Sequence, residues 1–285
     1  MASINSMTDV YDLHCHSTAS DGALSPTEVV NRAHRFGVTS LALTDHDTTA
    51  GLAEAQTTAQ ALGLRLIPGI ELSTLWQNQC FHVIGIGINP QHPALAEATQ
   101  HLHTLRMERA EKIAEKLAKK RIEGALDAIK KIVGNGMITR NHFAEYLLAE
   151  RHVDSLQEAF DRYLAKGKPA YVATPWTELE LAIQWINESG GVAVLAHPLR
   201  YQLKKNAMKR LLTAFKHAGG QGIEVITGRS NPEEVKRVLA IAEQYQLAGS
   251  TGSDFHAPDQ WVELGRLLPM PATITPVWEL LRLSH

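Results

Sequence analysis

The chain has 285 residues, of which 44% are hydrophobic and 20% charged, and a formal net charge of −2. These values are typical of a globular protein of one or two domains, without the overall positive charge that suits long nucleic acids. The sequence has no signal-peptide pattern and no apolar run of the roughly 20 residues that span a membrane. Its two cysteines form no CxxC pair. We therefore expect a cytoplasmic protein with no membrane association and no disulfide framework.

Strand and helix patterns alternate along the first ninety residues. Ser25-Pro26-Thr27-Glu28 is typical of a helix start, and Gly37 and Gly63 follow the two amphipathic stretches. These patterns predict helices at residues 25–36 and 49–62. Short apolar runs predict strands at residues 10–13, 38–43, 64–70 and 81–88.

The pattern changes after residue 91, because no strand is indicated from 92 to 168. Apolar positions at helical spacing predict a long helix at 94–120, followed by helices at 124–133, 140–150 and 155–164. Alternation then resumes, with helices at 177–189, 206–217 and 232–245 and strands at 191–196, 222–227 and 247–253. We predict a barrel domain of residues 8–91 and 169–285, interrupted by a helical insertion at residues 92–168, here called the cap.

About seven strand–helix units predict an α/β fold of parallel strands joined by crossover helices. An open doubly wound sheet and a closed barrel both satisfy this pattern. Most of the predicted strands end in residues that bind metals. These residues are His14, His16, Asp21, His46, Glu71, His82, His197, Asp254 and His256. Because the carboxyl ends of parallel barrel strands share one face, we expect these side chains to meet there.

The spacing of these residues favours a site with several metal ions. His14 and His16 stand two apart, as do Asp254 and His256, so each pair points to one side of an extended chain. The set exceeds what one tetrahedral zinc needs, and Glu71 could bridge two ions. We expect two or three divalent ions, with manganese (Mn²⁺) preferred and Zn²⁺, Fe²⁺ or Mg²⁺ as alternatives. Such sites suit in-line displacement at phosphorus.

The remaining histidines are expected to have other roles. His142, in the cap, is either a substrate contact or a surface residue. Seven others have no carboxylate at ligand spacing, and we expect ordinary surface or core roles for them. They are His34, His92, His101, His103, His152, His217 and His285.

Six motifs together resemble the polymerase-and-histidinol-phosphatase (PHP) family. In order they are DLHCHSTASDG from Asp12, LTDHDT from Leu43, GIELS from Gly69, FHVIGIG from Phe81, GGVAVLAHP from Gly190 and TGSDFHA from Thr251. They span nearly the whole chain except the cap. The resemblance implies a distorted seven-stranded, TIM-like β/α barrel and a phosphoesterase that uses two or three divalent metals.

The resemblance also implies three overlapping ligand sets joined by Glu71. His14, His16, Glu71 and Asp254 would hold the first metal, Glu71, His82 and His197 the second, and Asp21, His46 and His256 the third. We expect the third set and Glu71 to be the catalytic residues. Asp12, Asp45 and Asp47 would orient the ligand imidazoles through hydrogen bonds.

Within the family, the TDHDT motif, the cap and KGKPAYV (residues 166–172) resemble one bacterial branch. Its enzymes remove the 3′-phosphate from 3′,5′-bisphosphonucleotides, and some relatives trim short RNA from its 5′ end. We therefore hypothesise a 3′,5′-nucleotide bisphosphate phosphatase that hydrolyses its small-molecule substrate through attack by a metal-bound hydroxide. Arg140, His142, Lys168, Arg200 and Arg229 are the candidate substrate contacts, since a second phosphate needs its own cations.

Three alternatives remain at this point. The enzyme could be a 5′–3′ exoribonuclease acting on short RNA, or a histidinol-phosphate phosphatase. A metal-binding PHP module without activity is the least favoured, because none of the ligands is missing from the sequence. No feature indicates an obligate protein partner.

Overall fold

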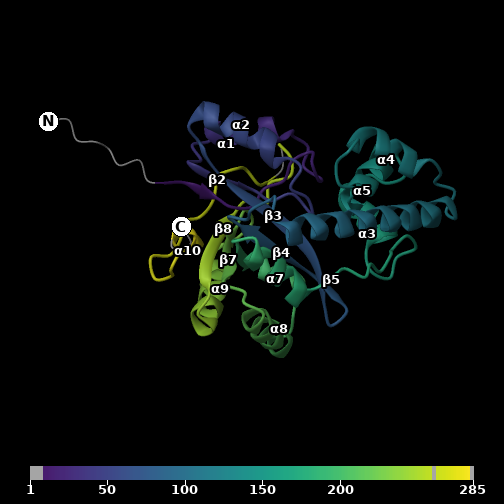
Figure 1. Cartoon of the computed structure of the whole chain (residues 1–285). Coiled ribbons are helices and arrows are strands. Elements are labelled where there is room, and N and C mark those ends of the chain that lie inside the picture. Colours follow the sequence, from purple (N-terminus) through teal and green to yellow (C-terminus); the bar gives the residue numbers. More distant parts are fainter. Residues whose placement is uncertain (1–8, 259–260, 283–285) are drawn as a thin grey trace.

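The computed structural model describes residues 9–258 and 261–282. Within these ranges, seven strands form a nearly closed barrel surrounded by helices, which confirms the predicted fold class (Figure 1). A further short strand, β5 (Thr177–Glu178), pairs with β3. The barrel strands, in their order around the sheet, are β1 (Tyr11–Asp12), β2 (Ser40–Leu43), β3 (Arg65–Trp76), β4 (Gln79–Ile86), β6 (Val192–Leu195), β7 (Gly222–Thr227) and β8 (Ala248–Gly252). The predicted barrel limits at 8 and 285, and His285, lie outside the described residues.

The barrel closes where the first strand meets the last. The backbone N–H of Leu13 donates to the carbonyl of Thr251 at 3.0 Å, just beyond the end of β1. Gly252 makes this approach possible, because a Cβ atom there would lie 2.3 Å from Cβ of His14. The closure brings the two ends of the predicted ligand set together.

The expectation that all strands run parallel is wrong for β4, which is antiparallel to both β3 and β6. Only Gln77 and Asn78 separate β3 from β4, and both have positive φ angles, of 48° and 60°. Positive φ at both central residues is the conformation of a tight two-residue hairpin. Parallel neighbours need a far longer crossover connection. The amino-terminal half of β4 therefore lies beside the carboxyl ends of the other strands.

Helices cover the outside of the barrel. They are α1 (Pro26–Arg35), α2 (Leu52–Leu62), α7 (Leu179–Glu188), α8 (Lys205–His217), α9 (Pro232–Tyr245) and α10 (Val277–Arg282). Ser25 caps α1 as its sequence predicts, since its hydroxyl accepts from the N–H of Glu28 and the Glu28 carboxylate accepts from the N–H of Ser25. Helix α10 was not expected; it places Trp278 in a stack on Tyr11. Among the described residues, no helix is both long and apolar enough to cross a membrane.

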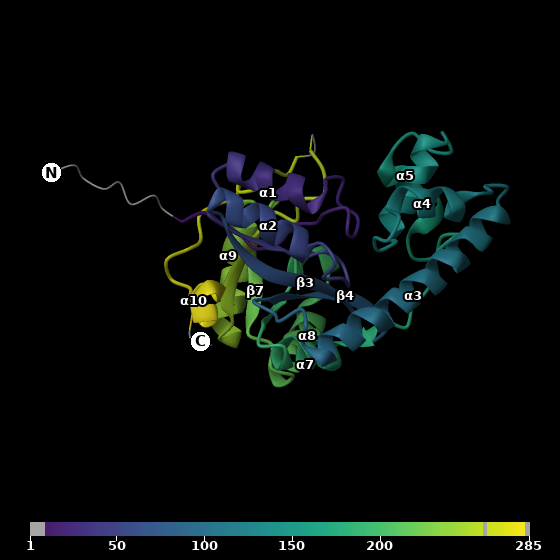
Figure 2. The same ribbon diagram turned by 45° about the horizontal axis from the view of Figure 1, so that its top comes forward.

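The cap projects to one side of the barrel (Figures 1 and 2). Its long helix α3 (Pro93–Ala118) leads away from the barrel to α4 (Ala125–Val133), α5 (Arg140–Ala149) and α6 (Leu156–Ala159), and a π-helical turn follows at Phe160–Leu164. The first half of α3 packs on the barrel core, whereas its second half joins a separate cluster of buried apolar side chains that extends from Ala110 to Val172. We propose that the cap folds around this cluster.

Phe143 on α5 provides a test of the cap core, since it is fully buried in that cluster. Replacing Phe143 with alanine should lower the free energy of unfolding by about 3–5 kcal/mol, because the removed ring leaves a cavity. Leu148→Ala on the same helix is the control: Leu148 is 36% exposed, so its loss should be about 1 kcal/mol or less. Urea unfolding followed by circular dichroism measures both. Equal losses would contradict the assignment of Phe143 to a packed core.

Candidate metal centre

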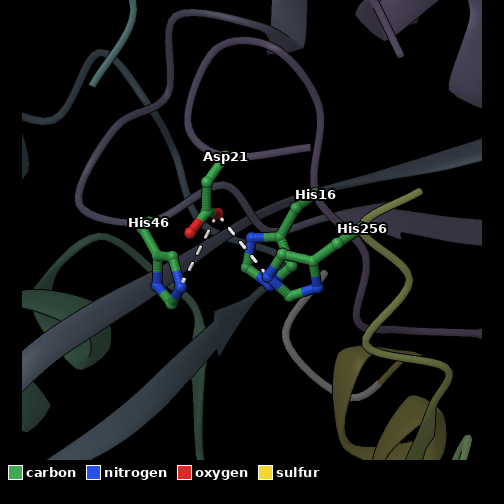
Figure 3. Close-up of side chains that lie close together, drawn as sticks. All are labelled: His16, Asp21, His46 and His256. Carbon is green, nitrogen blue, oxygen red and sulfur yellow. Dashed lines mark ion pairs between the residues drawn. The ribbon is translucent and has the colours of Figure 1, made fainter. Parts of the chain in front are cut away.

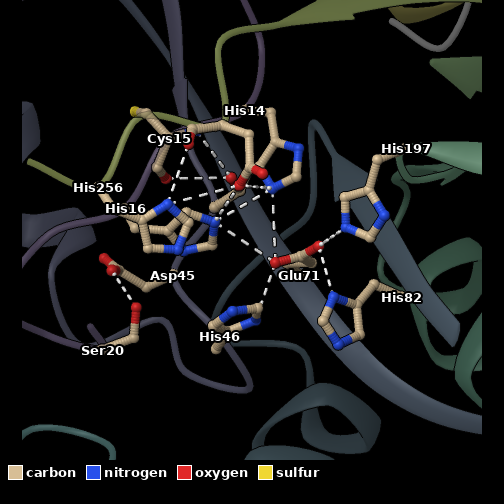
Figure 4. A network of polar contacts seen from close by, with 12 residues as sticks. His14, Cys15, His16, Ser20, Asp45, His46, Glu71, His82, His197 and His256 are labelled. Atoms are coloured by element: carbon tan, nitrogen blue, oxygen red, sulfur yellow. Dashed lines mark hydrogen bonds and ion pairs between the residues drawn. The ribbon is translucent and has the colours of Figure 1, made fainter. Parts of the chain in front are cut away.

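All nine predicted ligand side chains lie at one end of the barrel, where the carboxyl ends of the parallel strands meet. Figure 4 shows the six histidines among them that surround Glu71. His82 is no exception, although it lies near the start of β4, because that strand runs in the opposite direction. His14, His16 and Glu71 are completely buried. Asp21, His46, His82, Asp254 and His256 line a cavity above them.

The first predicted set converges on one point. The Nε2 atoms of His14 and His16 are 3.1 Å apart. Each lies 3.4 Å from Oε2 of Glu71, and Oδ1 of Asp254 is 3.3 Å from the first nitrogen and 3.2 Å from the second. Ligand atoms about 2.1 Å from a shared ion have separations of this size.

The second predicted set gathers around the other oxygen of the same carboxylate. Oε1 of Glu71 lies 3.0 Å from Nδ1 of His82 and 3.2 Å from Nε2 of His197. Figure 4 shows these two imidazoles on one side of Glu71 and those of His14 and His16 on the other. The two oxygens of Glu71 therefore face different sets, which is the arrangement a bridging ligand needs.

All three residues of the third predicted set line the cavity, and Figure 3 shows them together with His16. Oδ1 of Asp21 is 3.8 Å from Nε2 of His46 and 3.5 Å from Nε2 of His256. His16 has a ring nitrogen within the same small cluster. His46 also connects this set to the others, because its Nδ1 is 2.8 Å from Oε2 of Glu71.

The polar contacts in the centre suit cations better than hydrogen bonds. Oε2 of Glu71 is buried without a hydrogen-bond partner, although three ring nitrogens lie within 3.4 Å. Nδ1 of His46 is likewise buried and has no aligned partner. Leaving such groups unpaired is costly, and a cation between nitrogen and carboxylate ligands satisfies both. The residues therefore fit divalent ions, and their mixture of imidazoles and carboxylates suits Mn²⁺, Zn²⁺ or Fe²⁺.

Electrostatics keep the central carboxylates ionised. Burial alone would raise the pKa of Glu71, but the neighbouring His46, His82 and His14 hold it well below its usual value. Burial likewise opposes ionisation of Asp254, and His14 and His256 hold its pKa well below the ordinary range. Two buried negative charges thus stand among the imidazoles, which favours the binding of cations.

The three supporting carboxylates do not bond as predicted. Asp12 accepts from the N–H groups of Ser253 and Gly265. Asp45 accepts from Ser17 and Ser20, and Asp47 from Ser73 and Arg106. Among the described residues, none of the three hydrogen-bonds to a ring nitrogen of the set. They fix the loops that carry the ligands, because their partners are mainly backbone groups and hydroxyls of those loops.

The residue that does orient an imidazole is Glu224 on β7, which the sequence reasoning missed. Its Oε1 is 2.9 Å from Nδ1 of His14, whose ring donates, and its Oε2 accepts from the backbone N–H of His197 at 2.6 Å. Glu224 is 1% exposed. The available signal was a lone carboxylate in the otherwise uncharged strand GIEVIT. One side chain thus supports ligands of both the first and the second set.

The cap supplies a second missed residue, Arg106 on α3. Its guanidinium is 4% exposed, donates from Nε to Asp47 at 2.7 Å and from Nη2 to Ser73 at 3.1 Å, and lies over the ring of Trp176. Asp47 follows His46 directly, and its N–H donates to the carbonyl of Glu71. The cap is therefore joined to the ligand loops by a buried ion pair.

Three residues at these strand ends have left-handed backbone conformations. The φ angles are 56° at Asp47, 29° at His197 and 56° at Asp254. Residues other than glycine avoid this region at a cost of roughly 1–3 kcal/mol, and such strain collects at functional sites. The surrounding hydrogen bonds, including the one that the N–H of His197 donates to Glu224, hold these residues in place.

A cavity of about 1270 Å³ lies between the barrel ligands and the cap. Three of the predicted substrate contacts, Arg140, Arg200 and Arg229, line it. Arg200 also contacts the carboxylate of Asp254. His142 is not among the lining residues; its Nδ1 accepts from the N–H of Thr139 and so caps α5. Lys168 is exposed and lines a different hollow.

Comparison with protein families supports the resemblance noted from the motifs. Residues 12–186, more than half of the chain, match the PHP domain. The chain belongs to the PHP family. The PHP match includes six of the nine predicted ligands and the whole of the cap.

Three relatives of this PHP protein align over nearly its whole length. The 5′–3′ exoribonuclease Rnm of Escherichia coli is 44% identical over 95% of the chain and 93% of its own length. The 5′–3′ exoribonuclease of Haemophilus influenzae is 43% identical over 96% and 99%. The 3′,5′-nucleoside bisphosphate phosphatase of Chromobacterium violaceum is 41% identical over 94% of both chains.

Two solved structures share the fold over 96% or more of both chains. An amidohydrolase from Chromobacterium violaceum with bound sulfate has a TM-score of 0.91 at 40% identity. A structure from Bifidobacterium adolescentis described as a metal-dependent phosphoesterase has a TM-score of 0.84 at 26% identity. This PHP protein is accordingly a phosphoesterase, as the sequence predicts, and its residue clusters suit divalent metals.

Glu224→Gln tests whether that side chain positions the ligands. The amide can accept from only one of the two donors that Glu224 serves, so its NH₂ group would face either the His14 ring or the His197 N–H. We expect the affinity for Mn²⁺ to fall about 10–100-fold, measured by titration of metal-free protein with calorimetric detection. Glu233→Gln, the same charge change on the exposed surface of α9, should leave the affinity unchanged. Equal affinities in the two variants would contradict the positioning role.

Proposed function

We propose that this PHP protein removes the 3′-phosphate from 3′,5′-bisphosphonucleotides and releases a 5′-nucleotide. The observation that supports this is a second group of cations in the cavity besides the metal centre. Arg109 on α3 and Arg140 on α5 line the cavity from the cap, and neither forms an ion pair among the described residues. A substrate with two phosphates could be held by the metal centre at one end and by this arginine pair at the other.

The arginine pair is built to receive an anion. The guanidinium of Arg109 lies over Trp176, with 5.2 Å between its carbon and the ring centroid, and its buried Nε has no hydrogen-bond partner. Arg140 lies over Phe160 in the same way, at 5.9 Å. Burial and the nearby Arg140 lower the pKa of Arg109. Because arginine does not lose its proton in proteins, the two guanidinium groups remain charged and repel each other. A bound phosphate would offset this repulsion.

The ligand sets differ in their access to the cavity. His14 and His16 are sealed beneath it, whereas Asp21, His46 and His256 line it. We therefore place the reacting phosphate beside the third set. Divalent ions held here would act as Lewis acids on the phosphate and lower the pKa of water. Arg200 and Arg229 stand on the barrel side of the same cavity and would neutralise charge on the substrate.

A nucleoside substrate also fits the rim of the cavity. Trp261 lines this rim, and its side chain is 98% exposed, so it contributes almost nothing to the packing of the fold. An exposed indole beside a phosphate site is suited to stacking on a nucleobase. We propose that Trp261 contacts the base.

The exoribonuclease activity is the second candidate. Two of the relatives carry that name, and the cavity exceeds the roughly 300–1000 Å³ of ordinary small-molecule sites. A short RNA end could therefore enter it. Histidinol phosphate is less suited, because its ammonium group would face the arginine pair. The convergence of all nine ligands counts against a module without activity.

A phosphate-release panel on Mn²⁺-loaded protein tests the proposed function. The substrates are a 3′,5′-bisphosphonucleotide, histidinol phosphate and a short 5′-phosphorylated RNA, whose cleavage is followed by the release of 5′-mononucleotides instead of phosphate. We expect kcat/KM for the bisphosphonucleotide to exceed that for histidinol phosphate by about 100-fold or more, since charge-assisted contacts contribute roughly 1.5–3 kcal/mol each. Equal values for these two substrates would reject the bisphosphonucleotide assignment and leave the phosphoesterase class in place.

The arginine pair makes a separate prediction. Arg109→Ala and Arg140→Ala should each raise KM for the bisphosphonucleotide about 10–100-fold, because each removes a charge-assisted phosphate contact. KM for an aryl phosphate, which has one phosphate, should change less than threefold. Lys168→Ala is the control, since Lys168 lies outside the cavity, and it should alter neither value. Equal effects on both substrates would show that the arginines act on the fold or on the metals.

A further inference from the structure

A second hollow, of about 510 Å³, lies on the surface of the cap. Lys116, Lys119 and Lys120, from the end of α3, line it on one side, and Lys168 lines it on the other together with Gly167 and Pro169. We call these four lysines the lysine hollow. Lys166 and Arg121, which stand close to these lysines in the sequence, are also exposed to solvent. The concentration of positive charge contrasts with the net charge of −2 for the chain.

The lysines of this hollow are not neutralised by the protein itself. Lys119, Lys120 and Lys168 form no ion pair within the described residues. Glu115, one turn before Lys119, does not pair with it either. Lys116 donates to the backbone carbonyl of Tyr171 at 2.6 Å, a contact that leaves its charge uncompensated. Unpaired positive charges that line a concave surface attract an extended anion and do not stabilise the fold.

The lysine hollow adjoins the cavity of the metal centre. The N–H of Tyr171 donates to the carbonyl of Lys168 at 3.0 Å, so residues 168–171 form a turn with ends about 7 Å apart or less. Tyr171 lines the cavity, and Lys168 lines the hollow. A nucleic-acid strand leaving the cavity past Tyr171 would therefore reach the lysines within a few nucleotides. Arg109 lines the cavity and Lys116 lines the hollow, and both lie on α3.

We propose that the lysine hollow binds the phosphate backbone of a single-stranded RNA whose 5′ end occupies the cavity. The described residues that line the hollow are lysines, a glycine and a proline, with no aromatic side chain among them. Its lysines would therefore contact phosphates without reading the bases, so the binding is independent of sequence. This proposal depends on the proposed function in one respect: a nucleotide must be able to enter the cavity. The hollow would then decide how strongly the protein prefers an oligonucleotide to a mononucleotide.

Binding of RNA to Mn²⁺-loaded protein tests the proposal. The probes are RNAs of two and twelve nucleotides with a 3′ fluorescein and phosphorothioate linkages at the 5′ end that slow cleavage, followed by fluorescence anisotropy. The test variant is Lys119→Gln/Lys120→Gln/Lys168→Gln. The control is Lys204→Gln/Lys205→Gln/Lys209→Gln, which removes the same charge from exposed lysines at α8 of the barrel. An acidic peptide of matched charge is tested beside the RNAs.

We expect the test variant to bind the 12-mer about 10-fold more weakly or worse, with the dinucleotide and kcat/KM for the bisphosphonucleotide unchanged. The slope of log Kd against log salt should fall by about 2, or 0.7 for each of three lost contacts. An unchanged affinity for the 12-mer, an equal loss in the control, or preferential binding of the acidic peptide would overturn the proposal. Phosphatase activity without this length dependence would reject the hollow alone; the length dependence without phosphatase activity would reject only the proposed function.

Discussion

Glu71 is the group around which the site is organised. Its carboxylate is buried at the end of the barrel, and five imidazoles, from four different strands or the loops that follow them, have a nitrogen within 3.4 Å of it. The imidazoles belong to His14, His16, His46, His82 and His197. An ionised carboxylate in such a position requires positive partners, and neutral rings alone do not provide them. The barrel, its closure and its strained strand ends together place the metal-ligating imidazoles around this carboxylate.

The cap takes part in this arrangement in a way that its distance from the barrel in Figure 2 does not suggest. Arg106 reaches from α3 to Asp47, whose neighbour His46 contacts both Glu71 and the third set. The same helix presents Arg109 to the cavity one turn later. Substrate contacts and ligand geometry are thus connected through one helix, so a change in the position of the cap would affect both.

Much of this arrangement was predictable from sequence because barrel strands end at one face. That rule placed His14 and His46 correctly without any knowledge of their contacts. Glu71 lies at the same face, although β3 does not end there as predicted but continues to Trp76. The rule failed to give the direction of β4, since an apolar run does not reveal its polarity. The predicted strands at 64–70 and 81–88 also left a gap that concealed the two-residue turn at Gln77 and Asn78. His82 nevertheless reached the predicted place, because the reversal moves the start of the strand to that face.

Hydrogen-bond partners were much harder to predict than positions. Asp12, Asp45 and Asp47 stand beside the ligands in sequence, yet their bonds go to backbone groups, serines and an arginine. Glu224 is far from any motif and still orients His14. Lys168 lies in a conspicuous basic stretch, but it lines the separate hollow and not the cavity. Such assignments depend on contacts between residues far apart in the chain, which periodicity does not reveal.

The hairpin of β3 and β4 has a consequence for the order in which the site assembles. Glu71 and His82 are 11 residues apart and meet through a local turn, so this part of the centre can form as soon as that stretch of chain has been synthesised. The bond from Ser253 to Asp12 spans 241 residues, and loop closure over such a distance is slow and entropically costly. During synthesis at the ribosome, the metal centre would therefore be completed in stages, with the first and third sets, which include Asp254 and His256, completed last.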